Sequence, residues 1–427
     1  MAFPVEELRQ EYPALAQAGD FLFFDNAAGA QVPACALAAL TDHLIARNVQ
    51  RGGPYGRSQE VDAMIVRARE AVAAFVNARA PGEIAFGLNA TSFIRSISLA
   101  IGQALGDRPE IIVTELDHEA DIATWVALER VGARIVWWKV RDDGRLDTAD
   151  LEPLLSRHTR LVACTMASNA TGGRVEVADV ARLAHAVGAE VFLDAVHFGP
   201  HGPIDVQALD CDYLACSGYK IFAPHMGFAW CRAEAINRLP TFREHFIPDV
   251  MPDKLEAGTY AYENVAGMAA VVDYIERLGL RIGAPTTAPR RMRIRRAMEA
   301  IAEYEQTLSA GLLDAILSIG GATVYGVTDR ARLDRRVPTV SFTIDGVASS
   351  VIATQLASRG IGVRSGHMYA PRLMQRLGLM PEGTVRVSLV HYNSPAEIAR
   401  FATALGEVVA DARSGRHLAG DAPAGHR

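Results

Sequence analysis

The chain reads Val191-Phe192-Leu193-Asp194 and, further along, Ala215-Cys216-Ser217-Gly218-Tyr219-Lys220. The first stretch is an apolar strand that ends in a carboxylate. The second is an apolar run that enters a Ser/Gly turn carrying a lysine. Only a few of the 43 Lys+Arg residues are lysine, which argues against a routine surface role for Lys220. In sheets built from such strands, ligands bind beyond the carboxyl ends, where both polar residues fall.

This pairing of lysine and carboxylate is what a pyridoxal phosphate (PLP) enzyme requires. The amine of Lys220 can form a Schiff base with the aldehyde of the cofactor. The carboxylate of Asp194 can keep the pyridine nitrogen protonated, so that the ring accepts electrons from the substrate. The two stretches therefore predict a PLP site.

Length and composition set the broad class of protein. At 427 residues the chain is long enough for one large domain and a smaller one. Hydrophobic residues make up 50% and charged residues 22%, and the net charge of -6 gives no reason to expect nucleic acid or a membrane as partner. The chain starts with acids rather than a signal peptide, and its five cysteines are scattered without a CxxC pair. We expect a cytoplasmic protein with reduced thiols and without a metal site.

Helical stretches alternate with short apolar runs through the first two thirds of the chain. We expect helices at about 60–79, 119–132 and 176–188, and strands at 84–86, 111–114, 134–138, 161–165, 191–194, 213–215 and 227–231. This rhythm predicts an α/β fold with a mostly parallel sheet covered by helices on both faces.

The pattern changes after a loop rich in proline and arginine. A long helix at about 296–318 and strands at 337–344, 361–364 and 384–389 predict a smaller α+β domain. The expected organisation is an N-terminal segment at 1–20 that packs with the small domain, a large domain at 21–280, a small domain at 281–413 and a disordered tail at 414–427. A short apolar strand at 21–25 opens the large domain in this scheme.

These motifs, in this order, give the chain a resemblance to a known family. Over roughly residues 20–410 it resembles the fold-type I PLP enzymes of aminotransferase class V, in the cysteine desulfurase-like subfamily. The resemblance implies a seven-stranded, mostly parallel sheet between helices and a smaller α+β domain. It also implies PLP as cofactor, an amino acid as substrate, and a homodimer with shared active sites.

The resemblance assigns the contacts to the cofactor ring. His118 is expected to lie flat on the pyridine and to take part in proton transfer. His197 is expected to donate a hydrogen bond to the phenolic oxygen of the cofactor. Asn169 is placed between that oxygen and the substrate carboxylate.

The phosphate of the cofactor is assigned to a second group of residues. Asn89-Ala90-Thr91-Ser92 follows a strand and opens a helix, so its N–H groups and hydroxyls form an anion cradle. The resemblance places phosphate contacts at Ala90, through its backbone, and at Thr91, with the hydroxyl of Ser217 added. Thr259 resembles the residue that reaches the phosphate from the neighbouring subunit.

The resemblance places Arg386 at the α-carboxylate of the substrate, and a guanidinium suits this role because it forks onto a carboxylate through two parallel hydrogen bonds. Arg364 joins it as a substrate-binding residue. Arg364 opens the stretch RSGHMYA at 364–370, where cysteine desulfurases carry the cysteine that accepts sulfur as a persulfide. Met368 or Tyr369 stands in its place, and neither a thioether nor a phenol can accept sulfane sulfur.

We therefore expect a PLP-dependent C–S lyase that performs β-elimination on cysteine or an S-substituted cysteine without a persulfide relay. Aminotransfer or epimerisation of an amino acid remains an alternative, because both start with the loss of the same Cα proton. A non-catalytic PLP-fold binding protein is a third reading. Tyr219, where group II desulfurases commonly have histidine, and the loop Arg51–Tyr55 leave the substrate open.

Overall fold

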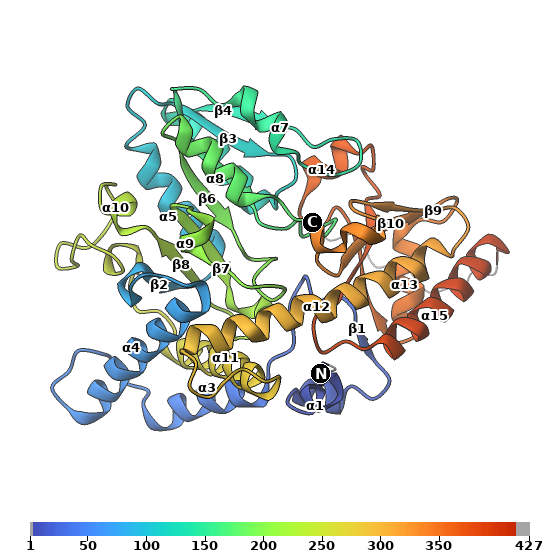
Figure 1. Cartoon of the computed structure of the whole chain (residues 1–427), viewed down its shortest axis with the longest axis horizontal. Helices are drawn as coiled ribbons and strands as arrows, with labels where there is room; N and C mark the ends of the chain where they lie inside the picture. Colours follow the sequence, from blue (N-terminus) through green and yellow to red (C-terminus); the bar gives the residue numbers. More distant parts are fainter. Residues whose placement is uncertain (1–2, 416–427) are drawn as a thin grey trace.

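A seven-stranded sheet forms the centre of the larger lobe in the computed structural model, which describes residues 3–415 (Figure 1). The strand order is β2-β8-β7-β6-β5-β3-β4. β3 to β7 run parallel to one another, and β8 runs antiparallel to its two neighbours, β2 and β7. The strands are β2 (Ile84–Gly87), β3 (Glu110–Thr114), β4 (Arg134–Trp138), β5 (Thr159–Thr165), β6 (Glu190–Asp194), β7 (Tyr213–Ser217) and β8 (Gly227–Cys231). The predicted mostly parallel sheet is confirmed.

The central strands of the sheet are buried on both faces because their middle positions are apolar. In β3, Ile111 and Val113 pack into one core and Ile112 into another on the opposite face. The first core includes residues of α5 (Ala90–Gly102), α6 (Glu119–Val126) and α10 (Ala233–Ile236). The second includes residues of α3 (Ala34–Ala46), α4 (Gly56–Val76), α7 (Thr148–Leu151), α8 (Val177–Ala186), α9 (Val206–Leu209), α11 (Tyr262–Arg281) and α12 (Arg290–Leu317).

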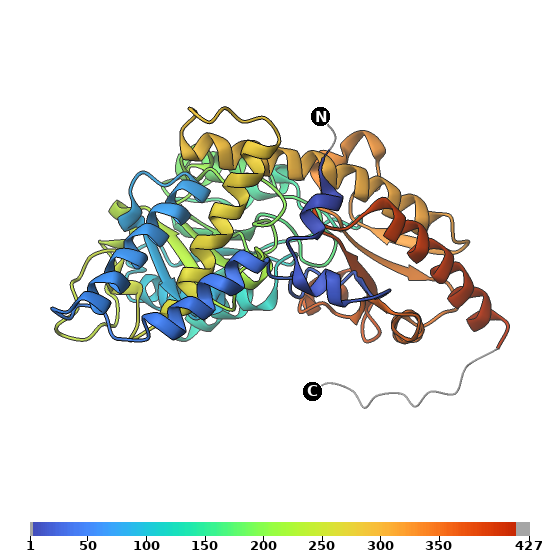
Figure 2. The same ribbon diagram turned by 90° about the horizontal axis from the view of Figure 1, so that it is seen from below.

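The smaller lobe is built on a four-stranded antiparallel sheet in the order β12-β13-β10-β9. Its strands are β9 (Ala322–Tyr325), β10 (Thr339–Ile344), β12 (Arg364–Gly366) and β13 (Thr384–Ser388). The helices α13 (Ser349–Ser358), α14 (Pro371–Arg376) and α15 (Pro395–Arg413) accompany it. α12 runs along both lobes, which lie side by side (Figure 2).

The first strand lies in a different lobe from the one expected. β1 (Leu22–Phe23) pairs in parallel with β11 (Ile361–Gly362), so the stretch assigned to the start of the large domain belongs to the small lobe. The N-terminal helices α1 (Val5–Arg9) and α2 (Pro13–Gln17) precede it. Arg9 forms an ion pair of 2.9 Å with Glu397 of α15, which joins the N-terminal segment to the small lobe. Most of the predicted disordered tail, 416–427, lies outside the described residues.

Four of the five cysteines are buried and Cys35 is partly buried, all with free thiols. In the described part of the chain, none of the helices has the length and apolar character needed to cross a membrane. β2, β3, β5, β6 and β7 all end at the same edge of the large sheet. Ligands bind at this edge in parallel sheets.

Candidate active site

One cavity at this edge brings together most of the residues that the sequence singled out. They are Ala90, Thr91, His118, Asn169, Asp194, His197, Ser217 and Lys220. They come from loops that follow β2, β3, β5, β6 and β7, which explains how residues far apart in the sequence converge. Arg364, Arg386 and Thr259 do not line this cavity.

Lys220 lies in a one-turn 3₁₀ helix (Gly218–Lys220) directly after β7. The turn packs tightly, since a Cβ on Gly218 would approach the carbonyl oxygen of Pro224 to 2.8 Å. The side chain of Lys220 is buried, and no described residue offers it a hydrogen bond or an ion pair. Burial, and next the charge of Arg386, lower the pKa of Lys220 to about 8. A large fraction of this amine is therefore uncharged and nucleophilic at mildly alkaline pH.

Asp194 closes β6 on the floor of the cavity. Its Oδ1 accepts a hydrogen bond of 2.8 Å from the backbone N–H of Val196. Burial raises the pKa of Asp194, while that hydrogen bond and the charge of Lys220 counteract the effect. A buried carboxylate of this kind gains from a cationic partner, such as a protonated pyridine nitrogen.

Two further carboxylates lie behind Asp194. Asp117 accepts a hydrogen bond of 3.1 Å from the N–H of Thr165, which pairs with Asp194 across β5 and β6. Asp121 accepts one of 3.0 Å from Trp125 Nε1, and its other oxygen is buried without a partner. Burial raises the pKa of Asp117 to about 7 and raises that of Asp121 well above its usual value. The raised pKa favours the neutral, protonated form of Asp121.

The N-terminus of α5 and the end of β7 meet at another wall of the cavity. The backbone N–H of Ala90 donates to Ser217 Oγ at 3.3 Å. Gly227 makes this approach possible, because a Cβ there would lie 2.5 Å from the carbonyl carbon of Asn89. N–H groups at the start of a helix together with hydroxyl groups bind phosphate well. Thr259 lies elsewhere in this chain: it is exposed and its hydroxyl accepts from Gln50 Nε2 at 2.9 Å.

His118 caps α6 through Nδ1, which accepts a hydrogen bond of 3.0 Å from the N–H of Ala120. Burial and then the charges of Lys220 and Arg386 lower the pKa of His118 to about 4. The imidazole is thus neutral at physiological pH. Its ring stacks on Tyr369 of the loop after β12.

Arg386 and Arg364 both bind one carboxylate, Asp25, which follows β1. Arg386 Nη2 donates to Asp25 Oδ1 at 2.7 Å and Arg364 Nε donates to Oδ2 at 3.0 Å. Arg386 is 1% exposed, its Nη1 donates to the carbonyl of Asn169, and its Nε has no partner. Asn169 in turn donates from Nδ2 to the carbonyl of Met368 at 2.6 Å. The arginines thus form a connected network with Asn169.

His197 is buried against the small lobe. Its Nε2 lies 3.0 Å from Thr339 Oγ1 of β10, and its ring meets that of His201 edge to face. Burial lowers the pKa of His197 well below its usual value, so the ring is neutral. A neutral imidazole can still donate through one ring nitrogen, as its expected role requires.

The donor set of this cavity fits PLP. An unpaired buried amine suits the aldehyde, a buried carboxylate suits the pyridine nitrogen, and a helix start with a serine hydroxyl suits the phosphate. Within residues 3–415 no group of three His, Cys, Asp or Glu side chains is arranged to hold a metal ion.

Sequence reasoning missed three features of this site, namely the Asp25 bridge, the stacking of Tyr369 on His118, and the pair Asp117–Asp121. Asp25 ends an apolar strand, just as Asp194 does, so its position carried a usable signal. The partners of Asp25 lie more than three hundred positions away, and no local pattern identifies them.

Comparisons with known proteins agree with this geometry. The family model described as aminotransferase class-V matches residues 22–288 and 290–401. The chain is 35% identical over 419 residues to "Aminotransferase-like protein FGM3" of Gibberella zeae, covering 96% of this chain and 99% of that one. It is 31% identical to a "Probable cysteine desulfurase" of Streptomyces coelicolor, covering 92% of this chain and 94% of the other.

A solved structure shows the same fold. The apo structure of cysteine desulfurase from Thermococcus onnurineus NA1 superposes with a TM-score of 0.85 at 26% identity, covering 96% of this chain and 99% of that one. The family model covers nearly the whole chain. The chain therefore belongs to the aminotransferase class V family of PLP-dependent enzymes, among relatives that include cysteine desulfurases.

Proposed function

We propose that this protein is a PLP-dependent C–S lyase that acts on cysteine or an S-substituted cysteine by β-elimination, without a persulfide relay. Family membership and relatives named cysteine desulfurases support a cysteine-type substrate. The observation that carries the proposal is the loop at 364–370, which closes on the site but brings no thiol to it.

The position of this loop is fixed from two sides. Asn169 Nδ2 binds the carbonyl of Met368, and the N–H of Glu119 binds the carbonyl of Tyr369 at 2.8 Å. The loop therefore brings the phenol of Tyr369, and no thiol, against His118, which supports a reaction without a persulfide relay. The five cysteines all lie among the described residues and none lines the cavity. Burial raises the pKa of the Cys216 thiol, which suppresses the thiolate that a relay requires.

The site residues divide the reaction between them. PLP, when bound, supplies an aldehyde that takes up the substrate amine and a ring that withdraws electrons from Cα. With the cofactor bound, Lys220 would serve as the base for the Cα proton. Asp194 would hold the pyridine nitrogen in its protonated form, and His118 would line the same cavity as a neutral ring. Arg386 and Arg364 bind the substrate carboxylate, which replaces part of their contact with Asp25.

Loss of the β-substituent then breaks the C–S bond, and the leaving thiolate takes up a proton. Counted from reactants to products, an S-substituted cysteine and water give a thiol, pyruvate and ammonium. This reaction requires a base, an anchored carboxylate and a leaving group able to depart as a thiolate. It does not require a protein cysteine.

The proposed contact of Thr259 with the cofactor phosphate requires a second subunit. Phe242 is 94% exposed, Phe246 81% and Leu99 62%, and Phe242 and Leu99 line one surface hollow. Exposed apolar groups of this size favour a protein partner. We propose that a second copy covers them in a cytoplasmic homodimer and that Thr259 reaches the phosphate of the partner's cofactor. A molar mass of one chain in solution would contradict this.

The test of the activity uses purified enzyme loaded with PLP and a panel of S-substituted cysteines. We expect pyruvate and free thiol in equal amounts, each measured directly. Cysteine itself should release sulfide without any requirement for an added acceptor. Transamination products, or deuterium exchange at Cα without pyruvate, would instead establish aminotransfer or epimerisation.

A further inference from the structure

The hydroxyl of Thr339 makes a hydrogen bond that determines how His197 meets the active-site cavity. Thr339 lies in β10 of the small lobe, and its side chain is fully buried. Its Oγ1 lies 3.0 Å from Nε2 of His197, which is the sole hydrogen-bond partner of this oxygen among residues 3–415. His197 lines the cavity from the large lobe and is buried as well. The two side chains therefore form a contact between the lobes at the wall of the cavity.

The direction of this hydrogen bond follows from the burial of the hydroxyl. His197 is neutral, because burial lowers the pKa of its ring well below the usual value, so one ring nitrogen carries a proton and the other accepts. If Nε2 carried the proton and donated to Oγ1, the hydroxyl hydrogen of Thr339 would be buried without an acceptor. Leaving a buried donor unpaired is unfavourable. The contact therefore favours donation from Thr339 to Nε2.

The proton of the His197 ring then lies on the other nitrogen, Nδ1. In the described part of the chain Nδ1 has no hydrogen-bond partner, and it is not fully enclosed by protein atoms. The ring of His201 meets that of His197 edge to face, with the centroids 5.3 Å apart, and its own Nδ1 lies 2.8 Å from Glu305 Oε2. His201 thus leaves the N–H of His197 available to a ligand in the cavity.

The backbone of Thr339 packs against the loop that carries Asn169. The N–H of Val337 donates to the carbonyl of Gly172, in that loop, at 2.9 Å. Gly172 has a φ of 74°, and a Cβ there would collide with the carbonyl oxygen of Thr339. The same carbonyl accepts a hydrogen bond of 2.6 Å from Nη2 of Arg336, which is buried. Thr339 is therefore fixed in position relative to the large lobe.

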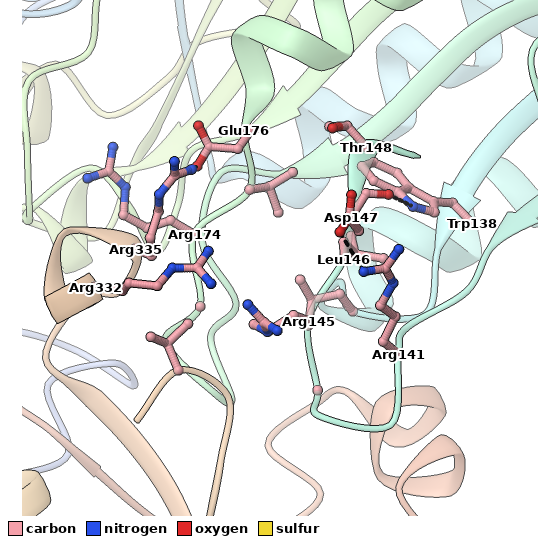
Figure 3. A pocket seen from close by; sticks show the side chains of 15 residues that line it. Trp138, Arg141, Arg145, Leu146, Asp147, Thr148, Arg174, Glu176, Arg332 and Arg335 are labelled. Carbon is pink, nitrogen blue, oxygen red and sulfur yellow. Dashed lines mark hydrogen bonds and ion pairs between the residues drawn. The ribbon is translucent and has the colours of Figure 1, made fainter. Parts of the chain in front are cut away.

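A neighbouring contact holds the two lobes together beside this one. The N–H of Arg174 donates to the carbonyl of Arg335 at 2.9 Å, and the side chain of Arg335 pairs with Glu176. Figure 3 shows these three side chains together on the wall of a pocket between the lobes. The placement of Thr339 against His197 therefore depends on how the small lobe sits on the large lobe.

We propose that Thr339 is a positioning residue for the cofactor, because its hydroxyl keeps the proton of His197 on Nδ1 and the ring then donates a hydrogen bond into the cavity. The opposite tautomer would turn a lone pair toward a ligand oxygen and repel it. This inference rests on the proposed contact of His197 with the phenolic oxygen of PLP. It adds a residue of the small lobe to that contact, so the donor is set correctly only when the lobes are in place.

The test determines the tautomer of His197 by NMR on the full-length protein, first without the cofactor and then loaded with PLP. Isotope labels at the ring nitrogens of histidine distinguish a protonated nitrogen from an unprotonated one. The variant His197→Gln identifies the signals of His197 among those of the 12 histidines. We expect the proton on Nδ1 in both forms. A proton on Nε2 in either form would overturn the proposal.

Variants of Thr339 show whether its hydroxyl is responsible. Thr339→Val has nearly the same shape and no hydroxyl, so the ratio of the two tautomers in the cofactor-free protein should move toward Nε2 by about fivefold or more. Thr339→Ser keeps the hydroxyl and should keep the parental tautomer. The matched control is Thr343→Val on the same strand, where the hydroxyl that is lost lies 3.1 Å from the hydroxyl of Tyr325. A valine variant of Thr339 with the parental ratio would contradict the proposal, and if that variant does not fold, the parent and the serine variant still decide.

A second readout connects the tautomer to the reaction. With PLP bound, Thr339→Val should lower kcat of the elimination by about two- to tenfold, the effect of one hydrogen bond, and Thr339→Ser should restore it. A parental kcat in a variant whose tautomer has shifted would contradict the positioning role. The NMR measurement does not depend on which reaction the enzyme performs, whereas a parent that releases no pyruvate or thiol would contradict the proposed function alone.

Discussion

The imidazole of His118 stacks on the phenol of Tyr369, with ring centroids 5.5 Å apart and ring planes inclined by 25°. The two residues come from different lobes, so the stack is a contact between the large-lobe cavity and the small-lobe loop. Tyr369 and its neighbour Met368 both have left-handed backbones, with φ of 57° and 54°. Such conformations are unfavourable for non-glycine residues and point to a functional constraint on this loop.

Replacing Tyr369 by alanine should lower kcat/KM by about tenfold, because an aromatic pair contributes roughly 1 kcal/mol and also orients the imidazole. Tyr369→Phe keeps the ring and should stay close to the parent. Steady-state kinetics of the elimination assay compare the two. A phenylalanine variant as impaired as the alanine variant would show instead that the hydroxyl is what matters.

Lys220→Ala should abolish elimination, with a loss of at least about a thousandfold in kcat, because the variant lacks both the imine-forming amine and the Cα base. Borohydride should no longer fix the cofactor covalently to the protein, which mass spectrometry detects. Lys139→Ala, at an exposed lysine, is the control and should behave as the parent. Unimpaired turnover by the Lys220 variant would refute the PLP assignment.

Asp194→Asn and Asp121→Asn should differ strongly although both positions are buried carboxyls. Asparagine cannot carry the negative charge that Asp194 supplies, so kcat should fall by about a hundredfold or more. Asp121 is protonated because burial and the charges of Asp117 and Asp194 raise its pKa, and asparagine mimics the neutral acid. Its variant should keep most of the activity and the melting temperature of the parent, as measured by kinetics and calorimetry.

The capture of PLP by the cofactor-free protein should depend on pH through Lys220. Its pKa of about 8 in the folded protein means that the fraction of Lys220 in the reactive neutral form increases as the pH rises through 8. The rate of appearance of the visible band, measured by stopped flow, should increase over this range and then level off. A rate that is flat between pH 7 and 9 would contradict the depressed pKa.

Protein stability should respond to the same titration. The unfolded amine titrates near 10.4. Below pH 8 both states bind the proton, and burial of the charged form destabilises the fold. Between the two pKa values the unfolded state binds more protons, so the free energy of unfolding of the cofactor-free protein should rise with pH. Lys220→Met removes this contribution and serves as the comparison in urea titrations.

Arg386→Lys should raise KM by about ten- to a hundredfold with a smaller effect on kcat, because an ammonium cannot fork onto a carboxylate. Arg386 is also held by Asp25 and Asn169, so circular dichroism should confirm that the variant is folded. Inhibition by a simple carboxylate such as acetate should weaken in parallel. An unchanged KM would place the substrate carboxylate elsewhere.

The large lobe could be predicted from the sequence because its determinants are local. Each strand contains a short apolar run, and the residues that close the parallel strands fall at the ligand edge by the geometry of such sheets. Asp194 and Lys220 follow from this rule, His118 is expected from the family resemblance, and all three line one cavity.

Features that depend on distant pairing could not be predicted. β1 has two residues and its partner lies at Ile361–Gly362. Nothing in the stretch 21–25 shows which sheet it joins, so it was assigned to the wrong lobe. The stacking of Tyr369 on His118 likewise depends on how the lobes meet. The sequence leaves Met368 or Tyr369 in the place of the cysteine and does not show what either side chain touches.

The pairing of β1 with β11 has a consequence for how the protein is made. The strand that emerges first from the ribosome stays without its partner until residue 361 has been synthesised, after the sheet of the large lobe is complete in sequence. Asp25 meets Arg364 and Arg386 only after that. If Arg364 and Arg386 anchor the substrate as proposed, a nascent chain that stops short of them could complete the cavity around Lys220 and still be inactive, because the carboxylate anchor is synthesised last.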